Sequence, residues 1–196
     1  EEIPDNDIDD DGNGKVDDTF GWDTLDDDNY PIDSNDGHGT QTAGIIGATG
    51  NDSVGLAGLA WTTQLMNIRV LSSSRGDSFS LTEGLLYAAT NGAQVLNVSL
   101  SSSAQNAMVS AALEDLETAG IIVVASAGND GINTDFFPQY PSAYDFSNIV
   151  SVAATTSNDE LASFSNYGVT TVDLAAPGAY TPTTTLGADY TVVSGT

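Results

Sequence analysis

A chain of 196 residues, 40% of them hydrophobic, is long enough to form one α/β domain around a substantial core. Its 28 acidic residues outnumber three basic ones, and the net charge of -25 argues against nucleic acid and anionic membrane surfaces as partners. The absence of cysteine excludes disulfides and cysteine-ligated zinc, and no apolar run is long enough to span a bilayer. The chain begins without Met and shows no signal peptide, so we expect a processed or excised piece.

Residues 1–36 form an acidic segment that holds about half of all the acids. Within it, oxygen-bearing side chains alternate from Asp9, and Gly14 permits a sharp turn, as in the first nine positions of a calcium loop. Phe20 stands where an EF-hand has its bidentate acid, and Asp18 is the residue that could compensate. Such close carboxylates repel one another unless a cation lies among them. The segment therefore favours structural calcium, with these candidate ligands: Asp9, Asp11, Asn13, Lys15, Asp17 and Asp18.

The alternative for this segment is a solvated acidic loop that holds no metal. A second acid cluster, at Asp23 and residues 26–29, is a weaker candidate for which a metal site and a solvated surface agree equally well with the sequence.

From residue 37 onward, apolar periodicity predicts alternating helices and short strands. The stretch at residues 121–126 is almost entirely apolar, which is typical of a parallel strand buried on both faces. The expected helices cover residues 39–47, 81–91 and 104–119, the last ended by Gly120. The expected strands cover residues 65–71, 94–100, 121–126, 148–154, 171–174 and 190–193. This order predicts one α/β domain, with a mostly parallel sheet, helices on both faces and functional residues at the carboxyl ends of the strands.

Two polar residues are candidates for chemistry. His38 is the only histidine, and it lies between two glycines at the start of an expected helix, where its ring can be exposed. Imidazole is the side chain best suited to exchange a proton near neutral pH, although a lone histidine is more often a residue without such a task. Asn129 follows an expected strand on a glycine turn, where its amide can donate to an oxyanion or simply stabilise the turn.

Together, several motifs in order along almost the whole chain resemble the subtilisin-like serine proteases, or subtilases. The matching segments are Asp11–Gly14 with Gly21–Asp23, Asp36–Thr40, Val95–Leu100, Ala127–Asn129, Tyr140–Ser142, Ala162–Gly168, Asp173–Gly178 and Ser194–Thr196. The resemblance implies a three-layer α/β fold, a secreted endopeptidase stabilised by calcium, and a peptide or protein substrate. It also implies that the Tyr140–Pro141 bond is cis.

The resemblance further implies a role for each matching position. His38 is similar to the general base of the catalytic triad, and Asn129 to the amide of the oxyanion hole. An edge strand that pairs with the substrate backbone would include Ser99, Leu100 and Ser101. The pocket for the substrate side chain before the scissile bond would be lined by Ala125, Ser126, Ala127 and Gly128.

The chain departs from the family pattern at several points. No acid stands in the context of the family's catalytic Asp, and the sequence stops at Thr196, directly before the position of the nucleophilic serine. Gln41 replaces a histidine that is common in the family but is not part of the triad, and Ser101–Ser102 replaces a glycine pair at the substrate edge. We therefore expect a fragment of a subtilase domain, truncated at both ends, that does not cleave peptides by itself.

The truncation implies one further property, because the surface that it uncovers favours a homo-oligomer. Two alternative functions remain. The first is a catalytically dead pseudoprotease that binds calcium and peptides, and the second is an unrelated acidic calcium-binding domain that matches the motifs by chance.

Overall fold

The computed structural model describes residues 2–33, 37–72 and 76–196. Its helices and strands follow one another in the order β1 Gly21–Asp23, α1 His38–Gly47, β2 Asn67–Arg69, α2 Ser78–Thr90, β3 Val95–Val98, α3 Ala107–Ala119, β4 Ile122–Ser126, β5 Ile149–Thr155, β6 Leu174–Pro177, β7 Thr181–Thr185 and β8 Asp189–Val193. The alternation of strands and helices from β1 to β4 confirms the expected α/β class.

The central sheet has four parallel strands in the order β3-β4-β5-β6. Val98 pairs with Ala125, and Ala125 pairs with Ser151, so the carboxyl ends of neighbouring strands meet at one edge of the sheet. β1 and β2 form a separate parallel pair, and β7 and β8 form an antiparallel hairpin. The expectation of a mostly parallel sheet is therefore confirmed.

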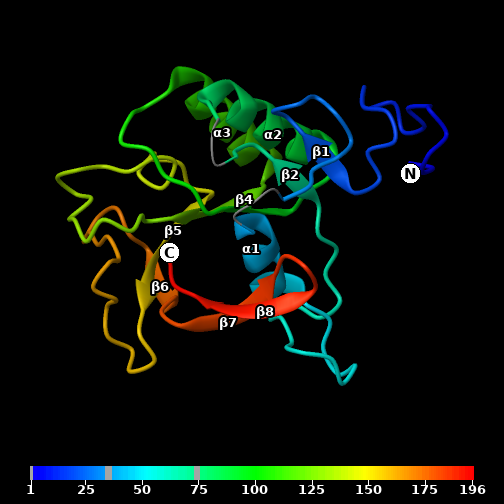
Figure 1. Cartoon of the computed structure of the whole chain (residues 1–196). Coiled ribbons are helices and arrows are strands. Elements are labelled where there is room, and N and C mark those ends of the chain that lie inside the picture. Colours follow the sequence, from blue (N-terminus) through cyan, green and yellow to red (C-terminus); the bar gives the residue numbers. More distant parts are fainter. Residues whose placement is uncertain (1, 34–36, 73–75) are drawn as a thin grey trace.

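The elements form three layers. Figure 1 shows α2 and α3 on one face of the central sheet, and α1 with the β7–β8 hairpin on the other. The first layer is held by apolar burial, because Leu113 and Leu116 of α3 are fully buried in one cluster with Leu85 of α2 and Val123 of β4. Burying each such side chain stabilises the fold by about 1.5–3 kcal/mol, so this cluster is the main core of the domain.

Several element boundaries differ from the sequence-based expectation. α2 begins at Ser78 and not at residue 81, because the Asp77 carboxylate accepts the Ser80 N–H at 2.9 Å and caps the helix. α3 ends as expected, with Gly120 in the left-handed conformation at φ 73°. β6 covers Leu174–Pro177, so only Leu174 of the strand expected at residues 171–174 lies in it. Asp173 precedes the strand and accepts the Ser151 N–H of β5 with its carboxylate, at 2.7 Å.

The strands β1 and β7 lie in segments for which the sequence predicted no strand. β1 has only three residues, and β7 is made almost entirely of threonines. Neither segment shows the apolar alternation by which strands are recognised. The Tyr140–Pro141 bond is cis, as the family resemblance implied.

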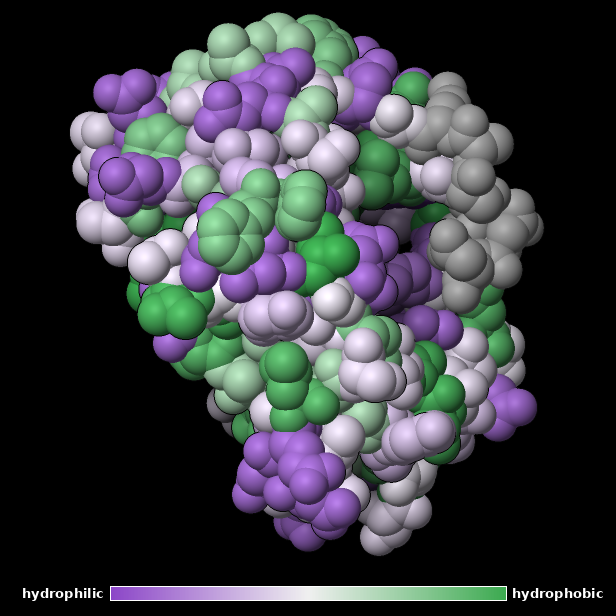
Figure 2. All heavy atoms as spheres, turned by 90° about the vertical axis from the view of Figure 1, so that its left-hand side faces the viewer, coloured by the Kyte–Doolittle hydropathy of each residue, from purple (hydrophilic) through white to green (hydrophobic). Residues whose placement is uncertain are grey.

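The surface is mixed in character. The loops that follow β4 and β5 form the left-hand side of the molecule in Figure 1, and Figure 2 shows hydrophobic and hydrophilic residues interspersed on that face. Among the described residues, no helix has the length and apolar content needed to cross a bilayer.

Candidate active site and calcium-binding loop

Asn129 lies in the loop that leaves β4, at the carboxyl edge of the central sheet. Ala127 is fully buried just before it, and its N–H donates to the carbonyl of Val152 on β5 at 3.0 Å. The side chain of Asn129 is exposed. The sheet therefore anchors the start of this turn and leaves the amide open to a ligand, as the sequence predicted for a residue at a strand end.

The last residue of the chain contacts this turn. Thr196 donates from both its N–H and its hydroxyl to Oδ1 of Asn129, each at 3.0 Å. The Gly128 N–H lies 3.2 Å from the Thr196 hydroxyl and 3.1 Å from the hydroxyl of Ser126, and these two hydroxyls also bond to each other. Because Oδ1 of Asn129 accepts the two bonds from Thr196, its Nδ2 group is the part of the side chain that can donate to a substrate oxygen.

The four predicted pocket residues lie next to Asn129 and are buried: Ala125, Ser126, Ala127 and Gly128. Gly128 has φ 100°, a conformation that glycine adopts readily and other residues rarely do. The structure thus brings this set together with Asn129 and Thr196 at one end of β4.

The predicted substrate edge has a different local structure from the one expected. β3 ends at Val98, so Ser99, Leu100 and Ser101 follow the strand and are not part of it. The Leu100 side chain packs against the apolar core, which leaves the backbone of this segment as its contact surface for a ligand. Ser99 accepts a bond from Asn97 at 2.9 Å, while Ser101 is exposed.

His38 is the first residue of α1, and its side chain is exposed. Gly37 precedes it with φ 73°, so the chain enters the helix through a left-handed turn that suits glycine. The Asp33 carboxylate accepts the Thr40 N–H at 2.7 Å and places a negative charge at the positive end of the helix. Asp36, which belongs to the same sequence motif, lies outside the described residues.

The β7–β8 hairpin links the two candidate catalytic residues, which lie on different elements. Thr183 and Thr184 of β7 donate from their hydroxyls to the carbonyls of Gln41 and Thr40 in α1, at 2.6 and 2.7 Å. Gly44 is required here, because a Cβ at this position would lie 2.1 Å from the Thr184 hydroxyl. β8 then runs into the segment that ends at Thr196, beside Asn129. The positions of both candidates thus depend on this hairpin, in which the sequence predicted the strand β8 but not β7.

Carboxylates converge in the acidic N-terminal segment. Oxygen atoms of Glu2, Asp9 and Asp11 lie within 4.8 Å of one another. The Asp9 carboxylate also accepts the N–H groups of Gly12 and Gly14, at 2.7 and 2.9 Å, and so closes the loop around itself. Hard oxygen donors of this kind suit calcium, and the residues present therefore fit the expected ion. The sequence did not indicate Glu2 as a ligand, because Glu2 lies seven residues before the start of the calcium-loop pattern at Asp9.

The other predicted ligands are arranged around this group in different ways. Asn13 donates from its amide to Asp18 at 2.9 Å, and Asp17 accepts the backbone N–H groups of residues 6 and 7. Lys15 cannot offer its side chain to a cation, since its ammonium lies 2.7 Å from Asp27 and 4.3 Å from the Trp22 ring centroid. The prediction of Lys15 as a ligand is therefore corrected for its side chain.

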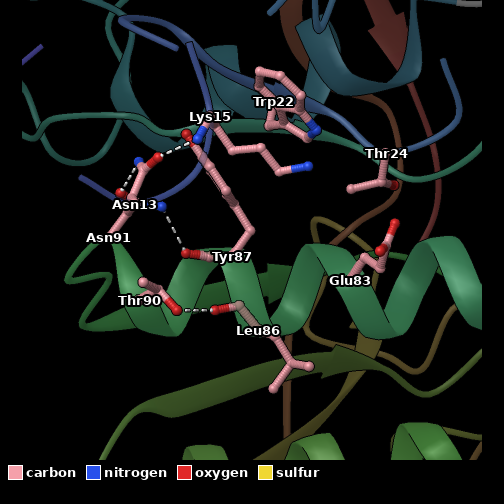
Figure 3. Close-up of a pocket in the computed structure, with 9 residues that line it drawn as sticks. All are labelled: Asn13, Lys15, Trp22, Thr24, Glu83, Leu86, Tyr87, Thr90 and Asn91. Carbon is pink, nitrogen blue, oxygen red and sulfur yellow. Dashed lines mark hydrogen bonds between the residues drawn. The ribbon is translucent and has the colours of Figure 1, made fainter. Parts of the chain in front are cut away.

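The acidic loop docks on α2 around a small cavity of about 220 Å³ (Figure 3). Asn13 donates to the Asn91 side chain at 2.7 Å, and the Tyr87 hydroxyl donates to the buried Asp18 carboxylate at 2.6 Å. Burial, together with this carboxylate, raises the pKa of the Tyr87 hydroxyl far above its usual value. Asp18 therefore attaches the loop to the helix, which is a different task from replacing the acid missing at Phe20.

The second acid cluster is occupied by protein cations. Asp23 is 1% exposed and pairs with Arg69, which also lies 3.0 Å from Asp26. The hydrogen bond from Arg69 to Asp23 raises the pKa of the guanidinium, and the bond from Lys15 lowers the pKa of Asp27. Three acids of this cluster are thus paired with protein cations: Asp23, Asp26 and Asp27.

Comparison with known proteins agrees with this architecture. Residues 5–196 match the subtilase family. Thermitase from Thermoactinomyces vulgaris is 41% identical over 184 residues, which are 93% of this chain and 63% of thermitase. A thermophilic serine proteinase from Bacillus sp. (strain AK1) is 39% identical over 177 residues, which are 90% of this chain and 42% of that protein.

A crystal structure of a cold-adapted subtilisin-like serine proteinase resembles the fold, with a TM-score of 0.77 and 32% sequence identity. The similarity covers 89% of this chain and 60% of that one. The chain thus spans less than two thirds of the length of each of these relatives.

Proposed function

The chain belongs to the subtilase family, and we propose that residues 1–196 form one catalytic domain, or part of one, of a subtilisin-like serine endopeptidase. In this proposal, residues 1–36 are its calcium-binding segment, and the whole protein hydrolyses peptide bonds with a Ser-His-Asp triad. The observation that carries the proposal is the contact of Thr196 with Asn129. A serine directly after Thr196 would enter the site beside the amide that stabilises the oxyanion.

The proposed roles follow from the chemistry of the groups. His38 takes the proton from the serine hydroxyl and returns it to the leaving amine. Nδ2 of Asn129 donates to the oxygen of the tetrahedral intermediate, while Thr196 occupies Oδ1. The backbone of Ser99–Ser101 pairs with the substrate, and Ala125–Gly128 line the pocket for one substrate side chain. The exposure of His38 and Asn129 supports these roles, because both can reach a ligand in solvent.

Calcium in the loop around Asp9 supplies positive charge that offsets the repulsion among the carboxylates. Glu2, Asp9 and Asp11 are the proposed side-chain ligands. Lys15 would contribute through its backbone carbonyl, as the residue at the corresponding position of a calcium loop does. A calcium requirement of this kind suits a secreted protein, since the ion is abundant outside cells. We therefore propose an extracellular location.

The proposal is tested by the hydrolysis of a chromogenic peptide. We expect the full-length protein to turn the peptide over, and His38→Ala and Asn129→Leu to lower kcat by at least 100-fold. Asn158→Ala, which changes an exposed asparagine on the turn after β5, is the matched control and should retain wild-type rates. Peptide binding without any turnover by the full-length protein would favour the pseudoprotease instead.

The 196-residue polypeptide by itself provides a second test. It contains no serine at the position after Thr196, so we expect it to form no acyl-enzyme and to show no turnover. Turnover by this polypeptide that His38→Ala abolishes would contradict the assignment of the nucleophile.

A further inference from the structure

Asn166 is a fully buried asparagine in the loop between β5 and β6, where it faces the turn that carries Asn129. Its Oδ1 accepts the N–H groups of Asp130 and Ile132, at 2.9 and 3.1 Å. Its Nδ2 donates to the carbonyl of Ala127 at 2.9 Å. Its own N–H donates to the carbonyl of Gly128 at 2.8 Å. These four bonds bracket Asn129, with two on the residues before it and two on residues after it.

The network admits only one orientation of the Asn166 amide. The oxygen faces two N–H donors and the nitrogen faces a carbonyl, so exchanging the two ends would set like groups against each other. The fit is also close, because a Cβ on Gly128 would lie 2.3 Å from Nδ2 of Asn166. Buried polar groups of this kind hold a local structure tightly when every partner is satisfied.

Neighbouring backbone bonds extend the same contact. The Gly131 N–H donates to the carbonyl of Phe164 at 2.8 Å, and the Tyr167 N–H donates to that of Ile132 at 3.0 Å. The turn after β4 is thus attached to residues 164–167 along its length. Within the described part of the chain, Asn166 is the residue whose side chain bonds to the backbone on both sides of Asn129.

We propose that Asn166 is a positioning residue, which acts through the backbone of residues 127–132 to aim the Asn129 amide at the reacting carbonyl. This inference rests on the proposed function of Asn129 as the oxyanion donor. An error of about 1 Å in the place of such a group lowers a catalysed rate by roughly 100-fold. Substrate binding depends on other contacts, so the loss of Asn166 affects kcat and leaves KM nearly unchanged.

Two variants separate the parts of the network. Asn166→Ala removes all three side-chain bonds, whereas Asn166→Asp keeps the acceptor for the Asp130 and Ile132 N–H groups and sets an oxygen against the carbonyl of Ala127. Asn148→Ala is the matched control. Asn148 is a partly buried asparagine whose amide donates to the carbonyl of Ile121, just before the opposite end of β4, at 2.8 Å.

The first measurement is made on the 196-residue chain and needs no activity. In NMR spectra we expect Asn166→Ala to shift the side-chain NH₂ signal of Asn129 and to speed hydrogen exchange of the Asp130 and Ile132 amides at least tenfold. Asn166→Asp should shift the same signal but keep most of the exchange protection. Asn148→Ala should lower the Tm without moving the Asn129 signal.

The second measurement is the hydrolysis of a chromogenic peptide by the full-length protein. We expect kcat to fall by about 10- to 100-fold in both Asn166 variants, with KM within threefold of the wild-type value. The inference would be overturned if both Asn166 variants left the Asn129 signal at its wild-type position and kcat within twofold of the wild-type value. If Asn166→Ala does not fold, the Asn166→Asp variant decides between these results. A full-length protein without any activity would refute the proposed function alone, because the NMR measurements still decide whether Asn166 orders Asn129.

Discussion

The N–H and the hydroxyl of Thr196 both donate to Oδ1 of Asn129 at 3.0 Å. Two donors on one oxygen fix the side-chain amide in a single orientation, which leaves Nδ2 as the group that can donate to a ligand. The two residues are 67 positions apart in sequence, and they meet because β8 returns the chain to the carboxyl edge of β4. The orientation of the proposed oxyanion donor is therefore set by the segment that would lead to the nucleophile.

Replacing Thr196 with Val tests this relationship. The variant keeps the backbone N–H but loses hydroxyl contacts with Asn129, Ser126 and Gly128. We expect unfolding in urea to become easier by about 1 kcal/mol, a typical loss for one hydrogen-bonding group. In the full-length protein, kcat should fall about tenfold. Thr191→Val, the same change earlier on β8, is the control, and an equal loss of kcat there would contradict a specific role for Thr196.

Acid should weaken the contact made by Asp135. Its carboxylate accepts bonds from the hydroxyl of Thr170 at 2.7 Å and the N–H of Val169 at 2.8 Å, which hold its pKa well below the usual value. A lowered pKa in the folded state gives stability above about pH 4 that is lost as the pH falls further. We expect Asp135→Asn to be less stable than the wild type at pH 7, and the difference between the two urea midpoints to shrink steadily as the pH falls below 4.

The control for this experiment is Glu114→Gln, which removes one charge from an exposed position on α3. A constant difference between Asp135→Asn and the wild type from pH 7 to pH 2 would show that the carboxylate of Asp135 does not supply the stability.

Alkaline pH should weaken the contact between Tyr87 and Asp18. Burial raises the pKa of Tyr87 in the folded protein, while in the unfolded chain it ionises near pH 10. The stability from the neutral hydroxyl is thus complete below about pH 10 and is lost as the pH rises above it. We expect Tyr87→Phe to lower the free energy of unfolding by about 1–2 kcal/mol near pH 7. The difference from the wild type should shrink above pH 10, and a difference that grows there would contradict the assignment.

The sequence predicted the central part of the fold well, because that part depends on apolar periodicity. Residues 121–126 and 104–119 read as a buried strand and a helix, and β4 and α3 lie within these ranges. The end of α3 at Gly120 was also predicted, since a left-handed residue at a helix end favours glycine. The pairing of β7 with β8 could not be predicted from the sequence. β7 is threonine-rich, shows no apolar alternation, and is defined by its contacts with α1 and β8.

The candidate site also has one part that the sequence predicted and one that it did not. Local motifs marked His38 and Asn129, and each lies at the element end where a strand or helix pattern predicted it. The contacts that orient the site join distant positions, such as Asn166 with Asp130 and Thr196 with Asn129. A single sequence carries no signal for such pairs, and their partners are found only when the fold brings them together.

Removal of calcium should destabilise the protein through the loop around Asp9. We expect EGTA to lower the Tm and added calcium to restore it, because an ion that binds only the folded state stabilises that state. Asp9→Asn should abolish most of the shift, since Asp9 both faces the proposed ion and accepts the N–H groups of Gly12 and Gly14. Glu114→Gln removes the same charge elsewhere and should keep the full shift.

Glu2→Gln tests whether the calcium site extends beyond the recognisable sequence pattern. A Glu2 oxygen lies within 4.8 Å of oxygens of both Asp9 and Asp11, so Glu2 should contribute to binding if a cation occupies this group. We expect the calcium midpoint, measured by the rise in Tm during titration, to increase about tenfold in Glu2→Gln. Glu2 also accepts N–H groups of residues 10, 11 and 17, which a glutamine oxygen can still accept. A variant with a lower Tm but an unchanged calcium midpoint would therefore assign Glu2 to loop structure and exclude it from the ligands.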